Sequence, residues 1–219
     1  MTALTVGSLF SGVGLCDLGL EWAGMKPRFF CEVDPFCRSV LRRHWPGLPI
    51  YEDVRNLRGE NLPHPDVLCG GFPCQDVSLA GKRKGITEGT RSGLWYEYVR
   101  LIEEIRPKYV IAENVPGLLA AGIETVLQEL AEIGYDAEWE VLPASAVGAP
   151  HRRERVFLVA YPHGRWVDPE HGILSALVGN MGKSYEPRFV SDWLGIRIDR
   201  TSRASVREAF GGCVLHRVD

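Results

Sequence analysis

A cysteine directly behind a proline is the residue of this chain best placed for covalent chemistry. Residues 66–69 (DVLC) have the apolar character of a buried strand, and the run GGFPC at 70–74 follows it. Proline fixes one backbone dihedral, so we expect the Cys74 thiol to be held just past a strand end, facing a cleft. The basic, glycine-containing loop at 78–85 could close on an anionic group. The alternative is an inert core cysteine, since cysteine is among the most often buried residues.

A carboxylate and a basic run offer partners for such a thiol. Glu113 follows the apolar residues 110–112, and a carboxylate at the end of a buried strand is costly without a partner or a task. Beside a thiolate it could stay protonated near neutral pH and donate to a ring nitrogen. The alternative is a helix N-cap that accepts from backbone amides.

The run RRER at 152–155 opens the last predicted strand. Alternate residues of a strand share a face, so Arg153 and Arg155 are expected to point the same way. Two guanidinium groups on one face suit a phosphate and a carbonyl oxygen. The alternative is a solvated basic edge strand.

A glycine turn after the first strand is typical of a site for a nucleoside-bearing cofactor. The run Ser11-Gly12-Val13-Gly14 allows close backbone approach, and Glu32 lies at about the ~20-residue interval at which an acidic residue takes a ribose diol. The third glycine of the dinucleotide fingerprint is missing, so the turn does not say which cofactor binds. A plain strand-to-helix turn is the alternative.

Strands and helices alternate along the first three quarters of the chain. The patterns predict strands at 4–10, 28–32, 66–69, 109–112, 138–142 and 156–160, and helices at 15–22, 35–44, 93–105 and 117–133. This order favours an α/β fold with a mostly parallel, doubly wound, Rossmann-like sheet. Ligands bind beyond the carboxyl ends of such strands. The residues predicted there are Phe10–Gly14, Glu32, Asp53, Pro73–Cys74 and Glu113–Asn114.

Composition bounds the remaining possibilities. The 219 residues are 45% hydrophobic, enough for one sizeable core, and no apolar run approaches the length of a membrane span. A signal-peptide pattern is missing at the start, so a cytoplasmic protein is expected. The six cysteines form no CxxC pair or Cys/His set, so we expect neither disulfides nor a metal site. The net charge of −3 means that any nucleic-acid contact must rest on local basic clusters.

Taken together and in chain order, these runs resemble the DNA cytosine carbon-5 methyltransferases. The matching segments are LFSGVGL (9–15), CEVD (31–34), Asp53-Val54, GGFPCQDVSLAGKRKG (70–85), RSGLWYE (91–97), AENVPGLL (112–119) and GAPHRRERVFLVA (148–160). The resemblance covers residues 4–160. It implies the class I S-adenosylmethionine-dependent methyltransferase fold, with residues 1–160 as a cofactor-binding and catalytic domain.

The resemblance implies a mechanism and a set of residue roles. Cys74 would attack carbon 6 of a flipped-out cytosine, Glu113 would hold or protonate the ring nitrogen, Arg155 would bind the ring carbonyl, and Arg153 a phosphate or the catalytic loop. Residues implied to line the S-adenosylmethionine site are Phe10, Gly12, Gly14, Leu15, Glu32, Asp53, Val54, Pro73 and Leu94. Residues implied on the side of the flipped base are Gln75, Ser78 and Asn114.

The C-terminal part departs from the family. Residues 161–219 are short for a target-recognition region, and the family's closing glycine-asparagine motif has no good match. We therefore expect a reduced, irregular C-terminal region and a short or truncated member. The resemblance implies that the protein binds double-stranded DNA and comes from a prokaryote or a phage. We expect a monomer. A restriction endonuclease of the same restriction-modification system is a candidate partner.

Three other interpretations stay open on the sequence. The first is the same chemistry on transfer RNA, although the Gly-Phe before Pro73 favours DNA because the RNA branch usually has a second proline there. The second is an idle relative that binds cofactor or DNA without turnover. The third, a nicotinamide oxidoreductase, lacks the third glycine and gives Cys74 and the RRER run no role.

Overall fold

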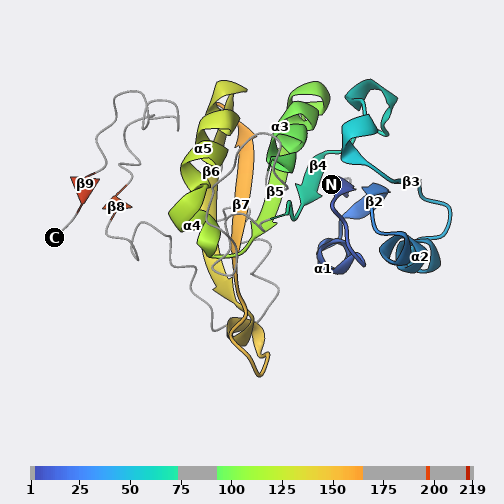
Figure 1. Ribbon diagram of the computed structural model, residues 1–219, viewed down its shortest axis with the longest axis horizontal. Coiled ribbons are helices and arrows are strands. Elements are labelled where there is room, and N and C mark those ends of the chain that lie inside the picture. Colours follow the sequence, from blue (N-terminus) through green and yellow to red (C-terminus); the bar gives the residue numbers. More distant parts are fainter. Residues whose placement is uncertain (1–2, 74–92, 165–195, 198–215, 218–219) are drawn as a thin grey trace.

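The computed structural model describes residues 3–73, 93–164, 196–197 and 216–217. Within these ranges seven strands form one sheet in the order β3-β2-β1-β4-β5-β7-β6 (Figure 1). The strands are β1 (Thr5–Leu9), β2 (Lys26–Cys31), β3 (Ile50–Tyr51), β4 (Val67–Gly70), β5 (Tyr109–Asn114), β6 (Tyr135–Pro143) and β7 (Glu154–Pro162). Strands β1 to β5 are parallel, and β7 runs antiparallel to both β5 and β6. The predicted mostly parallel α/β sheet is confirmed.

Helices cover both faces of the sheet. They are α1 (Leu15–Trp22), α2 (Pro35–His44), α3 (Leu94–Ile105), α4 (Gly117–Ala121) and α5 (Ile123–Glu132), with short 3₁₀ turns η1 (Val54–Asn56), η2 (Gly59–Asn61) and η3 (Ala144–Val147). The larger apolar core lies between the sheet and α3, α4 and α5. A smaller core on the other face packs Leu20 of α1 against β1, β4, β5 and β7. Burial on both faces explains why the parallel strands read as apolar runs.

Local sequence signals set the starts of the first two helices. Asp34 caps α2, because its Oδ1 accepts from the N–H groups of Phe36 and Cys37 at 2.8 and 3.0 Å, and Pro35 is the first helical residue. Gly14 precedes α1 with a φ of 84°, and a Cβ there would lie 2.5 Å from the Trp45 ring. Both the backbone conformation and the close packing therefore require glycine.

Two element predictions need correction. The helix predicted over 117–133 is two helices, α4 and α5, which meet at Gly122 in an extended conformation with a φ of −176°. The strands predicted at 138–142 and 156–160 are longer, because β6 and β7 pair over their whole lengths from Tyr135↔Pro162 to Pro143↔Glu154. Pairing between the two strands therefore extends the strand conformation beyond the segments that the sequence patterns predict.

The predicted C-terminal region, residues 161–219, lies mostly outside the described residues. Its described parts are the end of β7, the residues up to 164, and the short antiparallel pair β8 (Ile196–Arg197) and β9 (His216–Arg217). The proposed boundary at residue 160 stays a prediction. Among the described helices none has both the length and the apolar character needed to cross a membrane.

Candidate active site

One row of hydrogen-bonded strand residues aligns most of the predicted site. Tyr51, Cys31, Leu9, Gly70 and Ala112 are register partners across β3, β2, β1, β4 and β5. The next residues along these strands are Glu52, Glu32, Phe10, Gly71 and Glu113. Because the five strands are parallel, these residues emerge together at the carboxyl edge of the sheet, where neighbouring strands are about 4.8 Å apart. The order of the sheet therefore gathers residues that are far apart in sequence.

At the β1–β2 end of the row, Glu32 lies under the glycine turn. Its Oε2 accepts from the Gly12 N–H at 2.7 Å and its Oε1 accepts from the Asp34 N–H at 2.8 Å. Each carboxylate oxygen keeps a lone pair for a further donor. Among the described residues, a Cβ on Gly12 would meet nothing within 4 Å, so the described part of the chain leaves space beside the turn at that point. This arrangement can accept the two hydroxyl groups of a ribose.

The residues flanking this turn differ in exposure. Phe10 is half-buried, has a positive φ of 52°, and packs edge-on to Tyr98 with 6.2 Å between ring centroids. A positive φ is uncommon for a bulky residue, so packing holds the chain in a strained conformation as it leaves β1. Leu15, at the start of α1, is 75% exposed. Two of the predicted cofactor residues thus present apolar surface beside Glu32.

Asp53 and Val54 lie just beyond β3. The Asp53 carboxylate accepts from the backbone N–H of Arg55 at 3.0 Å and pairs with its guanidinium at 2.6 Å. These bonds from Arg55 hold the pKa of Asp53 below its ordinary value. Val54 is buried and belongs to the larger core, so its side chain packs inward and its backbone borders the edge of the sheet.

At the other end of the row, Glu113 and Arg155 form an ion pair. Arg155 Nε lies 2.7 Å from Glu113 Oε1, and the two side chains are 26% and 31% exposed. Glu113 is near the end of β5 and Arg155 is near the start of the antiparallel strand β7, so both reach the same edge. Within the described residues Arg155 has one further bond, from Nη1 to the Glu154 carbonyl at 2.8 Å. No bond from its Nη2 to a side chain or carbonyl is found among the described residues.

Burial dominates the acidity of Glu113. It raises the pKa of this carboxyl above its ordinary value, although the charges of Arg155 and Arg153 act in the lowering direction. A carboxyl of this kind holds a proton more readily than an exposed one, which suits a donor to a ring nitrogen. A Cβ on Gly71 would lie 2.8 Å from Glu113 Oε2, so a larger residue where the chain leaves β4 would have to displace this carboxyl.

The arginine prediction needs one correction. Strand β7 begins at Glu154, and Arg153 before it has a φ of 36°, outside the extended region. Strand alternation therefore does not apply to Arg153, and the prediction that the whole RRER run lies in the strand is wrong. The charges of Arg153 and Arg155 both act on the Glu113 carboxyl, and the shared direction of the two side chains stays a prediction. The edge-strand alternative is also excluded, because β7 lies between β5 and β6.

Asn114 is tied into the protein by both ends of its amide. Only 3% of it is exposed, its Nδ2 donates to the Phe72 carbonyl at 3.2 Å, and its Oδ1 accepts from the Val115 N–H at 2.9 Å. Phe72 is buried against Trp95 of α3, with 4.9 Å between ring centroids. Asn114 therefore fixes the backbone one residue before Pro73, and this positioning role was missed from the sequence.

The remaining predicted site residues are described only in part. Pro73 is half-buried and is the last residue of a described range. Leu94 is half-buried at the first turn of α3 and packs on the larger core. Cys74, Gln75 and Ser78 lie outside the described residues. The roles predicted for these three stay predictions.

Fold and site together define a class. A sheet in the order 3-2-1-4-5-7-6, with an acidic residue under a glycine turn after β1, is the arrangement of S-adenosylmethionine-dependent methyltransferases. A solved structure of a protein described as a DNA modification methyltransferase, encoded within an E. coli prophage, superimposes with a TM-score of 0.67. It is 27% identical, and the match covers 90% of this chain and 56% of that chain.

Sequence comparison gives the family. Residues 4–184 match the family described as C-5 cytosine-specific DNA methylase, and the chain belongs to this family. It is 39% identical over 180 residues to the type II methyltransferase M2.BsuMI of Bacillus subtilis, covering 78% of this chain and 45% of that protein. It is 42% identical over 165 residues to M.Eco47II of Escherichia coli, covering 71% of this chain and 39% of that protein. The chain thus spans less than half the length of these two relatives.

Proposed function

We propose that this chain transfers a methyl group from S-adenosylmethionine to carbon 5 of cytosine in double-stranded DNA. The observation that carries the proposal is the Glu113–Arg155 pair beside Gly71, three residues before the thiol of Cys74. Family membership supports the same reaction. Because the chain spans less than half of the two relatives compared above, activity of this polypeptide is part of the proposal.

The residues at the β1–β3 end fit S-adenosylmethionine. Glu32 offers carboxylate lone pairs to a ribose, and the described part of the chain leaves space beside Gly12 that a larger residue would fill. The backbone beside Asp53 and Val54 would flank the adenine, with Phe10, Leu15, Pro73 and Leu94 as apolar walls. When bound, this cofactor supplies an electrophilic methyl group.

The covalent step would use Cys74. Its thiolate forms a bond to carbon 6 of a cytosine rotated out of the duplex, and the electron pair displaced from the ring double bond becomes available at carbon 5. Glu113 donates its proton to the ring nitrogen, and Arg155 donates from Nη2 to the ring carbonyl, so negative charge on the ring is neutralised. Carbon 5 gains the methyl group, and S-adenosylhomocysteine is the leaving group. A water molecule then takes the proton from carbon 5, the returning electron pair expels the Cys74 thiolate, and the ring nitrogen gives its proton back to Glu113.

Two further residues support this step through position and charge. Asn114 holds the Phe72 carbonyl, which sets the direction in which the chain enters Pro73 and Cys74. The positive charge of Arg153 acts on Glu113, and its guanidinium would contact a DNA phosphate or the loop that carries Cys74.

A mechanism-based trap tests the proposal. Duplex DNA containing 5-fluorocytosine, incubated with S-adenosylmethionine and the chain, should give a covalent adduct on a denaturing gel, because fluorine cannot leave as a proton does. The adduct should be missing with Cys74→Ser. Intact cofactor binding without an adduct would contradict turnover and support a binding module. An adduct only with a fluorinated transfer RNA would move the substrate to RNA.

A further inference from the structure

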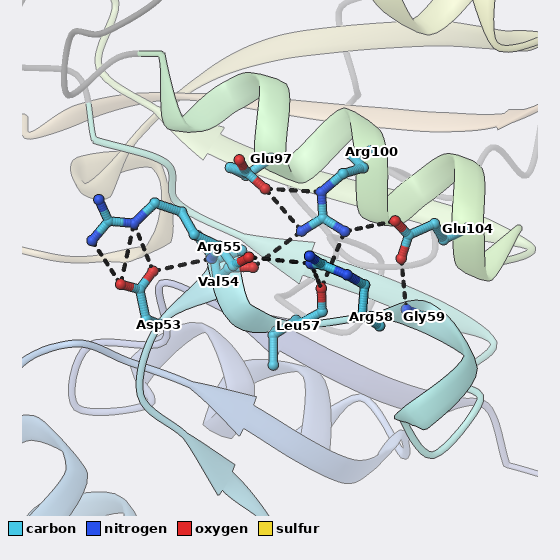
Figure 2. A network of polar contacts seen from close by, with 9 residues as sticks. All are labelled: Asp53, Val54, Arg55, Leu57, Arg58, Gly59, Glu97, Arg100 and Glu104. Carbon is cyan, nitrogen blue, oxygen red and sulfur yellow. Dashed lines mark hydrogen bonds and ion pairs between the residues drawn. The ribbon is translucent and has the colours of Figure 1, made fainter.

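An arginine of α3, outside all the motifs discussed above, bonds to the segment that follows β3 (Figure 2). Arg100 Nη2 donates to the Val54 carbonyl at 3.2 Å, and its Nη1 donates to the Leu57 carbonyl at 3.1 Å. Two acidic residues of the same helix hold the guanidinium, with Glu97 at 2.8 Å and Glu104 at 2.6 Å. The planar fork of arginine can bond to two carbonyls and two carboxylates at once, which a lysine cannot do.

The same helix holds the segment at a second point. Glu104 Oε2 accepts from the Gly59 N–H at 2.7 Å, and a Cβ on Gly59 would lie 2.7 Å from the Glu104 Cβ. Glycine at 59 thus allows the backbone to lie directly against α3. The bond from Arg58 Nη1 to the Leu57 carbonyl at 2.7 Å lies within the segment and does not reach α3. The bonds of Arg100 and Glu104 therefore fasten the backbone from Val54 to Gly59 to α3.

Regular backbone pairing does not hold this segment. Strand β3 ends at Tyr51, and the segment beyond it contains only the two short turns η1 and η2. The Asp53 side chain bonds to Arg55 within the same segment, so it gives no anchor to the rest of the protein. Among the described residues, four features hold Asp53 and the Val54 backbone along the sheet edge: buried apolar side chains, the Arg100 bonds, the Glu104–Gly59 bond, and the ion pair of Glu52 with Arg38 at 3.0 Å. Of these, the Arg100 bond is the one that reaches the Val54 carbonyl directly.

We infer that Arg100 is a positioning residue for the adenine end of the cofactor site. It lies on the same helix as Leu94, the first residue of α3, so one rigid element carries a predicted wall of the site and also sets the opposite side at Asp53 and Val54. The inference rests on the proposed function, because it assumes that these residues bind S-adenosylmethionine. Arg100 acts through the Val54 and Leu57 carbonyls and touches no ligand itself.

Ligand binding to matched variants tests the inference. The Kd values of S-adenosylhomocysteine and of 5′-methylthioadenosine, which lacks the amino-acid part, are measured by calorimetry for wild type, Arg100→Met and Arg100→Lys. Arg100→Met keeps the apolar stem and should weaken both ligands by about tenfold, the change that ~1.4 kcal/mol produces. Arg100→Lys should recover part of this loss, since an ammonium group can still pair with Glu97 and Glu104.

Arg106→Met is the control, at the residue that directly follows α3. Arg106 bonds to the Ile133 carbonyl and lies over the Tyr135 ring at the far end of α3, so its loss should lower Tm and leave both Kd values unchanged. Equal Kd values for wild type and Arg100→Met would overturn the inference alone, as would an equal weakening in Arg106→Met. Failure of the wild type to bind either ligand would overturn the cofactor site of the proposed function and the inference with it.

Discussion

Two glutamates occupy equivalent positions at the carboxyl edge of the sheet and are held in different ways. Glu32 accepts from two neutral backbone N–H groups, whereas Glu113 is paired with the guanidinium of Arg155. Neutral donors leave the first carboxylate free to accept hydroxyl groups. Burial raises the pKa of the second, which makes its proton available to a reacting ring. In the proposed function, the β1–β3 end therefore binds the cofactor and the β4–β5–β7 end donates the proton.

The largest expected effect comes from removing the acid at the second end. Glu113→Gln keeps the size of the side chain but cannot give up a proton, so methyl transfer to duplex DNA should fall by about a hundredfold or more. The measurement is incorporation of a radioactive methyl group, and the control is the Kd of S-adenosylhomocysteine, which should not change. A variant that loses cofactor binding as much as transfer would break the division between the two ends.

Asn114→Ala tests whether activity needs the bond that holds the Phe72 backbone just before Pro73. The change leaves the Phe72 carbonyl and the Val115 N–H without their side-chain partner, at about 1–2 kcal/mol of stability, and should slow methyl transfer about tenfold. Asn114→Asp keeps the acceptor for Val115 but loses the donor to Phe72, so it should show the slower transfer as well. Single-turnover rates measure both. Full activity of Asn114→Asp would show that the Phe72 bond is dispensable.

Glu32→Gln tests whether the β1–β3 end of the site serves cofactor binding and not the chemical step. The amide nitrogen would face the N–H of Gly12 or of Asp34, so one bond becomes a contact between two donors. We expect the Kd of S-adenosylhomocysteine to rise about tenfold, which corresponds to ~1.4 kcal/mol. The adduct with 5-fluorocytosine DNA should still form at saturating S-adenosylmethionine, whereas its loss under these conditions would show that Glu32 also takes part in chemistry.

Asp17 offers a test of burial alone, away from the strand-end row. It lies on α1, accepts from the Ser8 hydroxyl at 3.1 Å, and burial raises its pKa from 3.8 to about 6. The folded chain then binds this proton more tightly than the unfolded chain, so stability falls as pH rises from about 4 through 6. Asp17→Asn should be more stable than wild type at pH 7.5 by about 3 kcal/mol and equal to it below pH 4. Urea unfolding at several pH values measures the difference.

The contribution of Asp66 to stability should change with pH in the direction opposite to that of Asp17, and by less. At the amino edge of the sheet it accepts from Thr5 and pairs with Lys108 at 2.6 Å, and these bonds lower its pKa to about 2. The ionised Asp66 therefore stabilises the folded chain at pH values above its ordinary pKa of 3.8, and this stabilisation is lost as the pH falls toward 2. Asp66→Asn should cost less than about 1 kcal/mol at pH 7. A cost that stays the same at pH 3 would show that charge is not involved.

The sequence alone was enough to predict the mostly parallel sheet, four of its parallel strands, the start of α2 at residue 35, and the strand-end positions of Glu32 and Glu113. These features depend on local patterns: apolar runs, helical spacing, and glycines where the backbone turns. The helix break at Gly122 and the conformation of Arg153 were not predicted, because in each case the surrounding packing overrides a locally plausible pattern.

The sequence by itself determined which side chains stand at the carboxyl ends of the strands, since that follows from the alternation of short apolar runs and turns. Only the tertiary structure decided which of them meet: Glu113 with Arg155, Asn114 with Phe72, and Arg100 with Val54. The physical reason is that these contacts depend on the order of the strands, on the antiparallel position of β7 between β5 and β6, and on the way α3 packs on the sheet. Each of these features is set by contacts between residues far apart in sequence, which no local pattern encodes.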